Sequence, residues 1–422
     1  MMTQAFYSGI SGVKTHSSGI DIVSDNLANI STVGYRGSGY EFSSLFENML
    51  NTENGGINGT SVDSSIGLGT TLTATPMMQE MGSEILTDNS TDLAIMGNGW
   101  FGVQGNDTPI YTRDGSFTFD ANDDLVTQDG FHVLGTMGGN ITDGVLTQTL
   151  AEVPLGGVAA QEKLRFPKTL TYPPEPSTKA KFSGNIGTGA EVQTMGATVV
   201  DGNSNKNDLR LEFTKKEQQN PPGSQWDVTA VVQSLDGTTV YDTQTGSIEF
   251  DEKGALVSST LTTIDNNGTP VAIDLGTGFD GVVSIDNVNV SSSSVADGTI
   301  GGDLRGYDIN KNGEVVATFT NGRQSSVGKI AVYHFANEQG LERINGSRFK
   351  QSANSGEPIF FQDKDGKNII GTDITNFKLE GSNVSMNYGL TELIILQRSY
   401  DANAKSITTA DEMMQKALNM GA

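Results

Sequence analysis

The stretch LTELIILQRSYDANAKSITTADEMMQKAL, residues 390–418, decides how the C-terminal end of the chain folds. Its seam residues recur at alternating spacings of three and four, which is the heptad pattern of a helix that packs along a partner. At about 1.5 Å per residue this helix would extend for roughly 45 Å. The predicted seam consists of Leu390, Leu393, Gln397, Tyr400, Ala404, Ile407, Asp411, Met414 and Leu418.

The N-terminal end shows the same spacing and predicts a second helix. Its seam consists of Phe6, Ile10, Val13, Ser17, Ile20, Ser24 and Leu27, with Val23 and Ile30 beside it. Gly9, Gly12 and Gly19 weaken this helix, since each glycine costs up to about 1 kcal/mol relative to alanine. Neither helix carries enough charge to be stable as a solvated single helix, so both need partners. The pattern alone leaves open whether they pair with each other as a two-helix clip or pack only on assembly.

The composition between the two ends predicts a β-rich body. The chain has 422 residues, of which 52 are glycine and 35% are apolar, a share typical of many short strands joined by turns. It has no cysteine, so disulfides and thiolate metal sites are not available. Nearly all of the net charge of -24 lies in this body, which would repel nucleic acid and anionic membranes. No transmembrane run or cleaved signal peptide is expected.

The order of the predicted strands favours a nested arrangement of domains. Strand patterns on both sides of residues 165–302 belong together, and the block between them is inserted. The expected fold is mainly β with terminal α-helices that pair in a coiled coil. The predicted segments are a helical core from 1–30 and 388–422, a connector from 31–76 and 371–387, an inner β domain from 77–164 and 303–370, and an outer β domain from 165–302.

One motif imitates a nucleotide-binding site. Residues 97–102 match GxGxxG, but a dinucleotide site needs a helix to follow, and here a strand pattern resumes. We therefore interpret this glycine motif as a turn.

Two further segments imitate calcium loops. Asp308, Asn310 and Asn312 start such a loop, yet Phe319 stands where a bidentate glutamate is required. Asp120, Asn122 and Asp124 fail in the same way, and both segments are interpreted as hairpin turns. Neither the three histidines nor adjacent carboxylates form a catalytic motif, so no catalytic residue, cofactor or metal is expected.

Several short motifs together resemble the rod, hook and hook-associated subunits of the bacterial flagellum, the flagellar axial protein family. They are ANISTVGYR at 28–36, GNGWF at 97–101, YTRDGSF at 111–117, LVTQDG at 125–130, LEGSNV at 379–384, QRSY at 397–400, ANA at 402–404 and TADEM at 409–413. The residues of this family signature are Ala28, Asn29, Thr32, Gly34, Tyr35, Asn383, Val384, Arg398 and Asn403.

Within this family, VVATFTNGR at 315–323, GKIAVYHFANEQGL at 328–341 and the inserted block resemble hook subunits. The resemblance implies a structural subunit that polymerises into a curved, flexible tube, a universal joint that transmits torque and contains the export channel. It implies extracellular assembly after type III export without a cleaved signal peptide. The implied partners are further copies of the chain, the flagellar rod, the hook cap, the hook–filament junction proteins and the export apparatus, with no nucleic acid and no membrane insertion.

The same resemblance implies an assembly interface on both helices. On the N-terminal helix it consists of Phe6, Ile10, Val13, Ile20, Val23, Leu27 and Ile30. On the C-terminal helix it consists of Leu390, Leu393, Gln397, Tyr400, Ala404, Ile407, Met414 and Leu418.

Two alternatives stay open at this point. The connector at 35–69 is longer than in the shortest hook proteins, a feature shared by distal-rod subunits, which would form a straight polymer. We also hypothesise that this connector stiffens the tube.

The second alternative belongs to another class of protein. A secreted β-rich adhesin would be a monomer with calcium-dependent melting, but it would not explain two terminal heptad helices.

Overall fold

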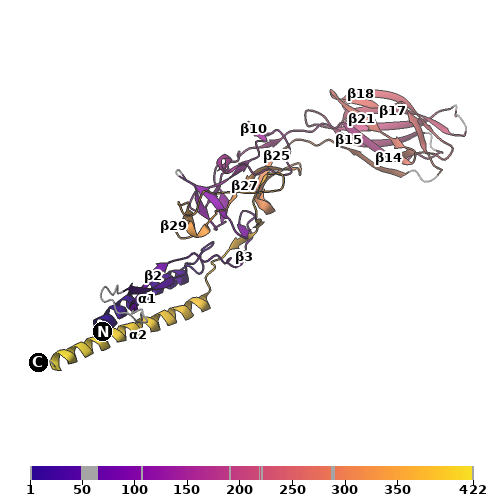
Figure 1. Cartoon of the computed structure of the whole chain (residues 1–422). Coiled ribbons are helices and arrows are strands. Elements are labelled where there is room, and N and C mark those ends of the chain that lie inside the picture. The colour runs from indigo at the N-terminus through magenta and orange to yellow at the C-terminus, as the bar shows by residue number, and fades with distance from the viewer. Residues whose placement is uncertain are drawn as a thin grey trace, which may run out of the picture.

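The computed structural model describes residues 2–48, 65–105, 108–189, 192–217, 219, 222–286 and 290–420. The molecule is elongated (Figure 1), with a helical end that holds both termini, an inner β domain in the middle and an outer β domain at the far end. Among these residues, no helix is long and apolar enough to cross a membrane. Residues 49–64 of the predicted connector lie outside the described part.

Two long helices form the helical end: α1 (Met2–Ala28) and α2 (Met386–Met420). They run antiparallel, since Gly9 faces Ile407 while Leu27 faces Gly389. A hairpin of β1 (Glu41–Asn48) and β2 (Ser65–Ala74) lies along α1, where Thr15 Oγ1 donates a hydrogen bond of 2.9 Å to the Thr70 carbonyl.

The inner domain is built from both halves of the chain. The strands before the insertion are β3 (Glu84–Leu86), β4 (Leu93–Met96), β5 (Trp100–Gln104), β6 (Ile110–Thr112), β7 (Phe117–Phe119), β8 (Leu125–Thr127), β9 (His132–Met137), β10 (Ile141–Thr142), β11 (Val145–Leu146), β12 (Glu162–Lys163) and β13 (Thr171–Tyr172). Those after it are β25 (Gly302–Ile309), β26 (Glu314–Phe319), β27 (Gln324–Ile330), β28 (Val332–Tyr333), β29 (Glu342–Asn345), β30 (Arg348–Lys350), β31 (Phe361–Gln362), β32 (Asn368–Ile369), β33 (Asp373–Asn376) and β34 (Lys378–Glu380). The halves pair through β9 with β27, β5 with β28, β4 with β33 and β3 with β34.

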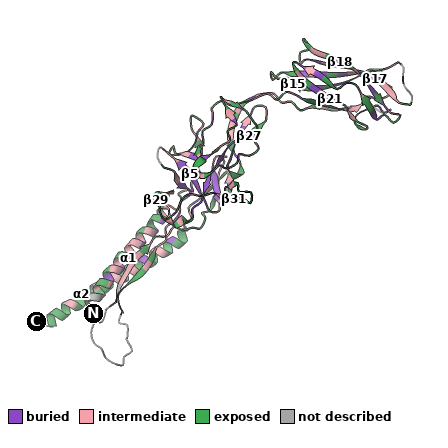
Figure 2. Cartoon of the chain, turned by 45° about the horizontal axis from the view of Figure 1, so that its top comes forward, coloured by how far each residue is buried: buried purple, intermediate pink, exposed green. Residues whose placement is uncertain are grey.

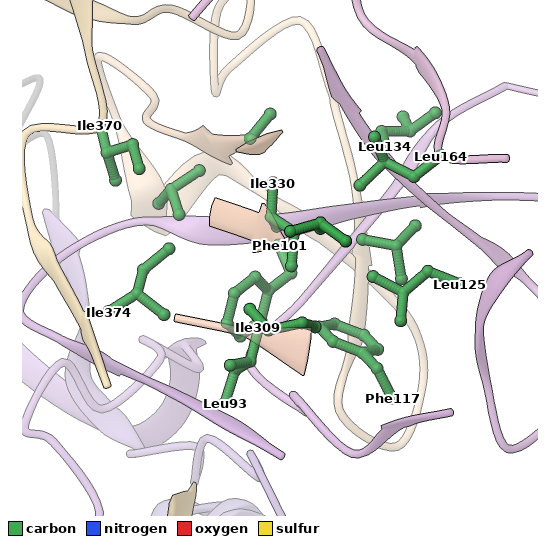
Figure 3. Packing of buried hydrophobic residues seen from close by; sticks show 14 of the residues in the cluster. Leu93, Phe101, Phe117, Leu125, Leu134, Leu164, Ile309, Ile330, Ile370 and Ile374 are labelled. Carbon is green, nitrogen blue, oxygen red and sulfur yellow. The ribbon is translucent and has the colours of Figure 1, made fainter. Parts of the chain in front are cut away.

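The inner core joins side chains from both halves. Figure 3 shows Phe101, Phe117 and Leu125 from the first half packed with Ile309 and Ile330 from the second, and all five are buried. The rings of Phe101 and Phe117 meet edge to face with centroids 5.1 Å apart. Because neither half can bury these residues alone, this domain requires the full chain.

The outer domain packs two sheets around its own core. Its strands are β14 (Lys179–Asn185), β15 (Val192–Val200), β16 (Lys206–Lys215), β17 (Ser224–Ser234), β18 (Val240–Phe250), β19 (Leu256–Ser259), β20 (Thr263–Asn266), β21 (Thr269–Asp274), β22 (Gly276–Thr277), β23 (Asp280–Val283) and β24 (Val290–Ala296). The larger sheet has the order β15-β16-β17-β18-β19, and every neighbouring pair is antiparallel. Along β17 the residues alternate, and Trp226, Val228, Ala230 and Val232 are fully buried, as expected for a strand with one face on the core.

The boundary between the two β domains differs from the predicted residue 165. Phe166, Leu170 and Tyr172 all lie in the core of the inner domain, and β13 pairs with β25. The connection between the domains is a two-stranded ribbon at Glu175 and Thr299, whose amides and carbonyls bond reciprocally at 2.9 and 2.8 Å. The prolines that mark the link are therefore those at 173, 174 and 176, while the apolar residues just before them extend the inner core.

A second boundary also moves. Residues 371–387 were predicted as connector, yet β33 lies within them, pairs with β4 and places Ile374 in the inner core. The alternation of Ile374 with polar neighbours is too short to be recognised as a strand without its partner.

One turn type recurs at several hairpins and explains the false calcium motif that starts at Asp120. Asp120, Asp201, Asp251 and Asp363 each accept hydrogen bonds from the amides two and four residues further on, at 2.8–3.0 Å. The residue at the fourth position of each turn has a positive φ, for example 60° at Asp123 and 82° at Gly254. The aspartate thus caps its own turn, which is a structural reason for this pattern of Asp and Asn.

Candidate assembly surfaces

The contact between α1 and α2 within the chain is lined by small residues. A Cβ at Gly9 would lie 2.7 Å from Ile407 Cγ1, and one at Gly12 would lie 2.5 Å from Asn403 Oδ1. A Cβ at Gly389 would lie 2.8 Å from Leu27. These glycines allow the two helix backbones to approach more closely than larger side chains would permit.

This intrachain seam keeps the predicted spacing but lies one residue earlier. On α2 the residues that face α1 are Gly389, Leu396, Asn403 and Ala410, seven apart. On α1 they are Gly9, Gly12, Gly19 and Val23. Of the predicted seam, Val23, Leu27 and Ile407 take part in this contact, whereas the exposed Ile10, Leu390, Tyr400 and Leu418 lie outside it.

The structure places the predicted interface residues at very different depths. On α1, Val23 is buried, Phe6, Val13, Ile20, Leu27 and Ile30 are half-buried, and Ile10 is exposed. On α2, Leu393, Ala404, Ile407 and Met414 are half-buried, and Leu390, Gln397, Tyr400 and Leu418 are exposed.

Large apolar side chains outside the predicted seam are exposed as well. Tyr7 is 65% exposed, Ile394 and Ile395 are each 57% exposed, and Met420 is 86% exposed. Figure 2 shows the helices mostly in the colours of intermediate and exposed residues, in contrast to the buried strands of the β domains. Exposed apolar side chains are typical of an interaction site where they form a contiguous patch.

A buried ion-pair network joins the helical end to the inner domain. The Glu380 carboxylate binds Arg36 Nη2 at 2.8 Å and Arg113 Nη1 at 3.2 Å, and all three side chains are almost fully buried. Arg113 also donates a hydrogen bond of 2.7 Å to the Gly97 carbonyl. Burial lowers the pKa of Arg113 to about 10, although the carboxylate of Glu380 opposes this shift. Both arginines therefore stay charged at neutral pH.

The family signature surrounds this network. Tyr35 is buried and donates a hydrogen bond of 2.9 Å to Asp25 on α1; burial and this bond raise the pKa of Tyr35 to about 12. Asn383 accepts from the Gly37 amide at 2.8 Å and donates to the carbonyls of Met78 and Glu80. Together these bonds tie α1, the connector and the segment before α2 into one unit.

The remaining signature residues have local roles. Gly34 has φ of 65° and its Cα lies too close to Asp114 for any side chain, so glycine is required there. Thr32 donates a hydrogen bond of 3.2 Å to Asn29, and Val384 packs near Gly37. Asn403 fills the space over Gly12, while Ala28 and Arg398 are exposed.

Sequence reasoning missed the residues that hold this joint together. Arg36, Arg113 and Glu380 each lie in a motif that carries the family resemblance, but in three separate segments, so no local spacing could show that they meet. Asn26, which bonds both backbone groups of Ser38 at 2.7 and 2.9 Å, was also missed. For the helix contact a signal did exist, because Gly9, Gly12 and Gly19 share one helical face. Their helix propensity alone indicates only a loss of helix stability.

The candidate chemical residues are held in structural contacts. His334 Nε2 lies 2.7 Å from the Ile370 carbonyl, and His16 packs edge to face on Phe42 with ring centroids 5.5 Å apart. His132 lies 3.7 Å from Asp124. Within the described ranges, no three side chains of the metal-ligating types gather around one point. The residues at 97–99 form the turn between β4 and β5 and are not followed by a helix.

Comparison with known proteins identifies the family. Three family models match in chain order: the flagella basal body rod protein at residues 6–36, the flagellar hook protein FlgE/F/G D1 domain at 94–158, and the flagellar basal body rod FlgEFG protein C-terminal at 377–420. Flagellar hook protein FlgE of Brucella suis is 30% identical over 98% of this chain and 97% of its own length. The Escherichia coli FlgE is 26% identical over 99% of this chain and 100% of its own length.

The fold agrees with a solved structure as well. The crystal structure of Helicobacter pylori flagellar hook protein FlgE2 superposes with a TM-score of 0.52 at 17% sequence identity, covering 70% of this chain and 100% of that chain. The similarity in sequence extends over almost the full length of the Brucella relative, including both helices that frame the assembly surfaces. The chain therefore belongs to the flagellar hook protein family.

Proposed function

We propose that this chain is the subunit of a curved, flexible hook tube, in which α1 and α2 form the inner wall and the β domains form the outer layers. The observation that carries the proposal is that one face of each helix packs against the other helix while apolar side chains elsewhere on both helices stay exposed. The glycine seam already joins α1 to α2, and yet Ile10, Leu390, Tyr400 and Leu418 remain exposed. Their apolar area is then available for neighbouring copies.

The geometry of such contacts favours an open polymer. The exposed rows on α1 and α2 differ from each other, so a contact between one copy's α1 and another copy's α2 is heterologous. A heterologous contact that does not close into a ring extends into a helical filament. In this arrangement the tube surrounds an export channel, and bending is accommodated by small shifts between the outer β domains of neighbouring copies.

The same proposal covers export and partners. The chain would pass through the flagellar type III export apparatus without a cleaved signal peptide and assemble under a hook cap, between the rod and the hook–filament junction proteins. A glycine-bearing helix is marginal in isolation, which favours threading of the unfolded chain and delays self-association until assembly. The role is structural and involves no catalysis.

The proposal is tested by placing a charge in the exposed apolar row. Leu390→Asp should abolish or strongly reduce hook formation in cells and polymerisation of the purified chain. The folded monomer should keep its melting temperature, since the side chain of Leu390 is 47% exposed. The matched control is Ser406→Asp, which adds the same charge at an exposed polar position of α2 and should assemble normally.

Electron microscopy of the polymer separates the alternatives. A curved tube supports the hook subunit, and a straight one indicates a distal-rod subunit. A wild-type chain that stays monomeric and melts at a calcium-dependent temperature would instead support an adhesin. If L390D assembled as well as S406D, the proposed role of the exposed row would be refuted.

A further inference from the structure

The C-terminal end of α2 extends beyond α1, and among the described residues it is mostly exposed. Ala410 is the last residue of α2 that is buried. Beyond it Met413 is 50% exposed and Met420 is 86% exposed. Figure 1 shows the C-terminus projecting past the N-terminus of α1. We call residues 411–420 the overhang.

The face of the overhang has a specific chemical character. Met413, Lys416, Ala417 and Met420 lie at helical spacings of three and four, and so they share one side of α2. This face presents two flexible thioether side chains, which adapt well to irregular apolar surfaces, with one cation between them.

A cavity of complementary character lies at the opposite end of the helix pair. It has a volume of about 540 Å³ and is bordered by α1, the segment at 78–80 and the start of α2. Val23, Met78, Val384 and Tyr388 provide its apolar lining, and Glu80 and Glu392 add two carboxylates. The cavity therefore combines apolar and polar lining with two carboxylates, which suits an apolar helix end that carries a lysine.

The overhang cannot reach this cavity within one chain. Tyr388 and Met420 stand on the same straight helix, and the 32 residues between these positions span about 48 Å. If the overhang occupies this cavity, it must therefore come from a second copy. The overhang and the cavity lie at opposite ends of the helix pair, which is the arrangement that a head-to-tail contact requires.

We propose that the overhang of one copy docks into the cavity of a second copy, with Met420 against the apolar lining and Lys416 near Glu80 and Glu392. The contact rests on the proposed self-assembly of the chain and defines one axial contact within the tube. It links copies in rows along the tube and closes a hollow at the joint between the helical layer and the inner domain.

Cysteine cross-linking tests the contact directly, since the chain contains no cysteine of its own. Polymers are assembled from an equal mixture of Met78→Cys and Met420→Cys chains and then oxidised. The expected product is a disulfide-linked dimer. A chain that carries both Met78→Cys and Met420→Cys should give a ladder of higher multimers. The control mixture of Leu235→Cys with Met420→Cys should give no dimer, since Leu235 is an exposed residue of the distant outer domain.

A charge exchange provides a second, independent measurement. Lys416→Glu alone and Glu80→Lys alone should each raise the critical concentration for polymerisation by roughly three- to tenfold. The double variant should return the critical concentration toward that of the wild type.

The outcomes distinguish this inference from the proposed function. Polymers that form normally but give no 78–420 cross-link, or a double charge variant no better than the single ones, would overturn the docking contact and leave the tube subunit intact. A wild-type chain that forms no polymer would overturn both.

Discussion

At the scale of single residues, Glu380 is the group that joins three separate segments of the chain. Its carboxylate is shared by Arg36 and Arg113, and the three side chains come from the connector, the inner domain and the segment before α2. A buried carboxylate between two guanidinium groups offsets charges that would otherwise be very unfavourable away from water. The ion pairs of Glu380 thus also connect the helical end of the molecule to the inner β domain.

We predict that Glu380→Gln destabilises the inner domain by about 3–5 kcal/mol, since it leaves two buried cations without their counter-ion. The chain has two tryptophans, and Trp100 lies in the inner core with the Arg113 guanidinium 5.4 Å from its ring. Urea unfolding followed by Trp100 fluorescence in a Trp226→Phe background measures the effect. Glu84→Gln, which removes only the half-exposed pair with Lys378, is the control and should cost at most about 1 kcal/mol. Equal losses in the two variants would contradict the prediction.

At the scale of elements, the two helices show what an apolar period can predict and what it cannot. Both helices were predicted from heptad spacing, and their described bounds differ by at most two residues from the predicted ones. The register of the intrachain seam was not predictable in this way, because it depends on the absence of side chains at Gly9, Gly12 and Gly389. Periodicity detects residues that need burial, but it does not show which of them are buried within the chain and which stay exposed.

For a glycine of the α1–α2 seam, close packing and helix propensity predict opposite effects of a substitution by alanine. Alanine is the better helix former by about 1 kcal/mol, so Gly9→Ala would stabilise an isolated α1. In the folded chain the added Cβ would lie 2.7 Å from Ile407 Cγ1, so the Ile407 side chain or the helices themselves must shift. We expect Gly9→Ala to lower the melting temperature of the assembled polymer, whereas Ser24→Ala, at an exposed position of α1, should leave it unchanged or higher. A rise in melting temperature for G9A comparable to that for S24A would show that the seam is not a close contact.

At the scale of the whole molecule, the β domains are two separate cores connected by a short ribbon. The ribbon is held from the inner domain by Arg323, whose Nη2 donates to Thr299 Oγ1 at 2.7 Å and lies 3.4 Å from Glu175. The insertion of the outer domain into the inner domain was predictable, because the strand patterns before and after the inserted block belong to one domain. The exact boundaries were not, since Phe166, Leu170 and Ile374 join the inner core through pairings between distant segments.

Because the two cores are separate, the stability of the outer domain can be measured independently of the inner domain. The aspartates in its turns and strands predict how this stability changes in acid. Asp201 is fully buried; burial raises its pKa, but hydrogen bonds from Asn267, Asn205 and backbone amides lower it overall below the ordinary value of 3.8. The pKa of Asp242 is lowered as well, chiefly by the amide of Asp265. A carboxyl group with a lower pKa in the folded state contributes stability that is complete above the unfolded value. This contribution is lost as the pH falls through the folded pKa.

We therefore expect the outer domain to keep its stability down to about pH 4 and to lose stability progressively below pH 3.8. Trp226, buried in that core, reports the transition in a Trp100→Phe background through urea unfolding at pH 7, 4 and 3. Asp201→Asn should cost about 1–3 kcal/mol at pH 7, because an amide cannot accept all of the same hydrogen bonds, and it should flatten the loss in acid. Asp280→Asn, at a position that is 86% exposed, should change neither value appreciably. An acid dependence in D201N as steep as in the D280N control would mean that the capped turns do not carry the pH response, and that the acid sensitivity of the outer domain arises from its net charge instead.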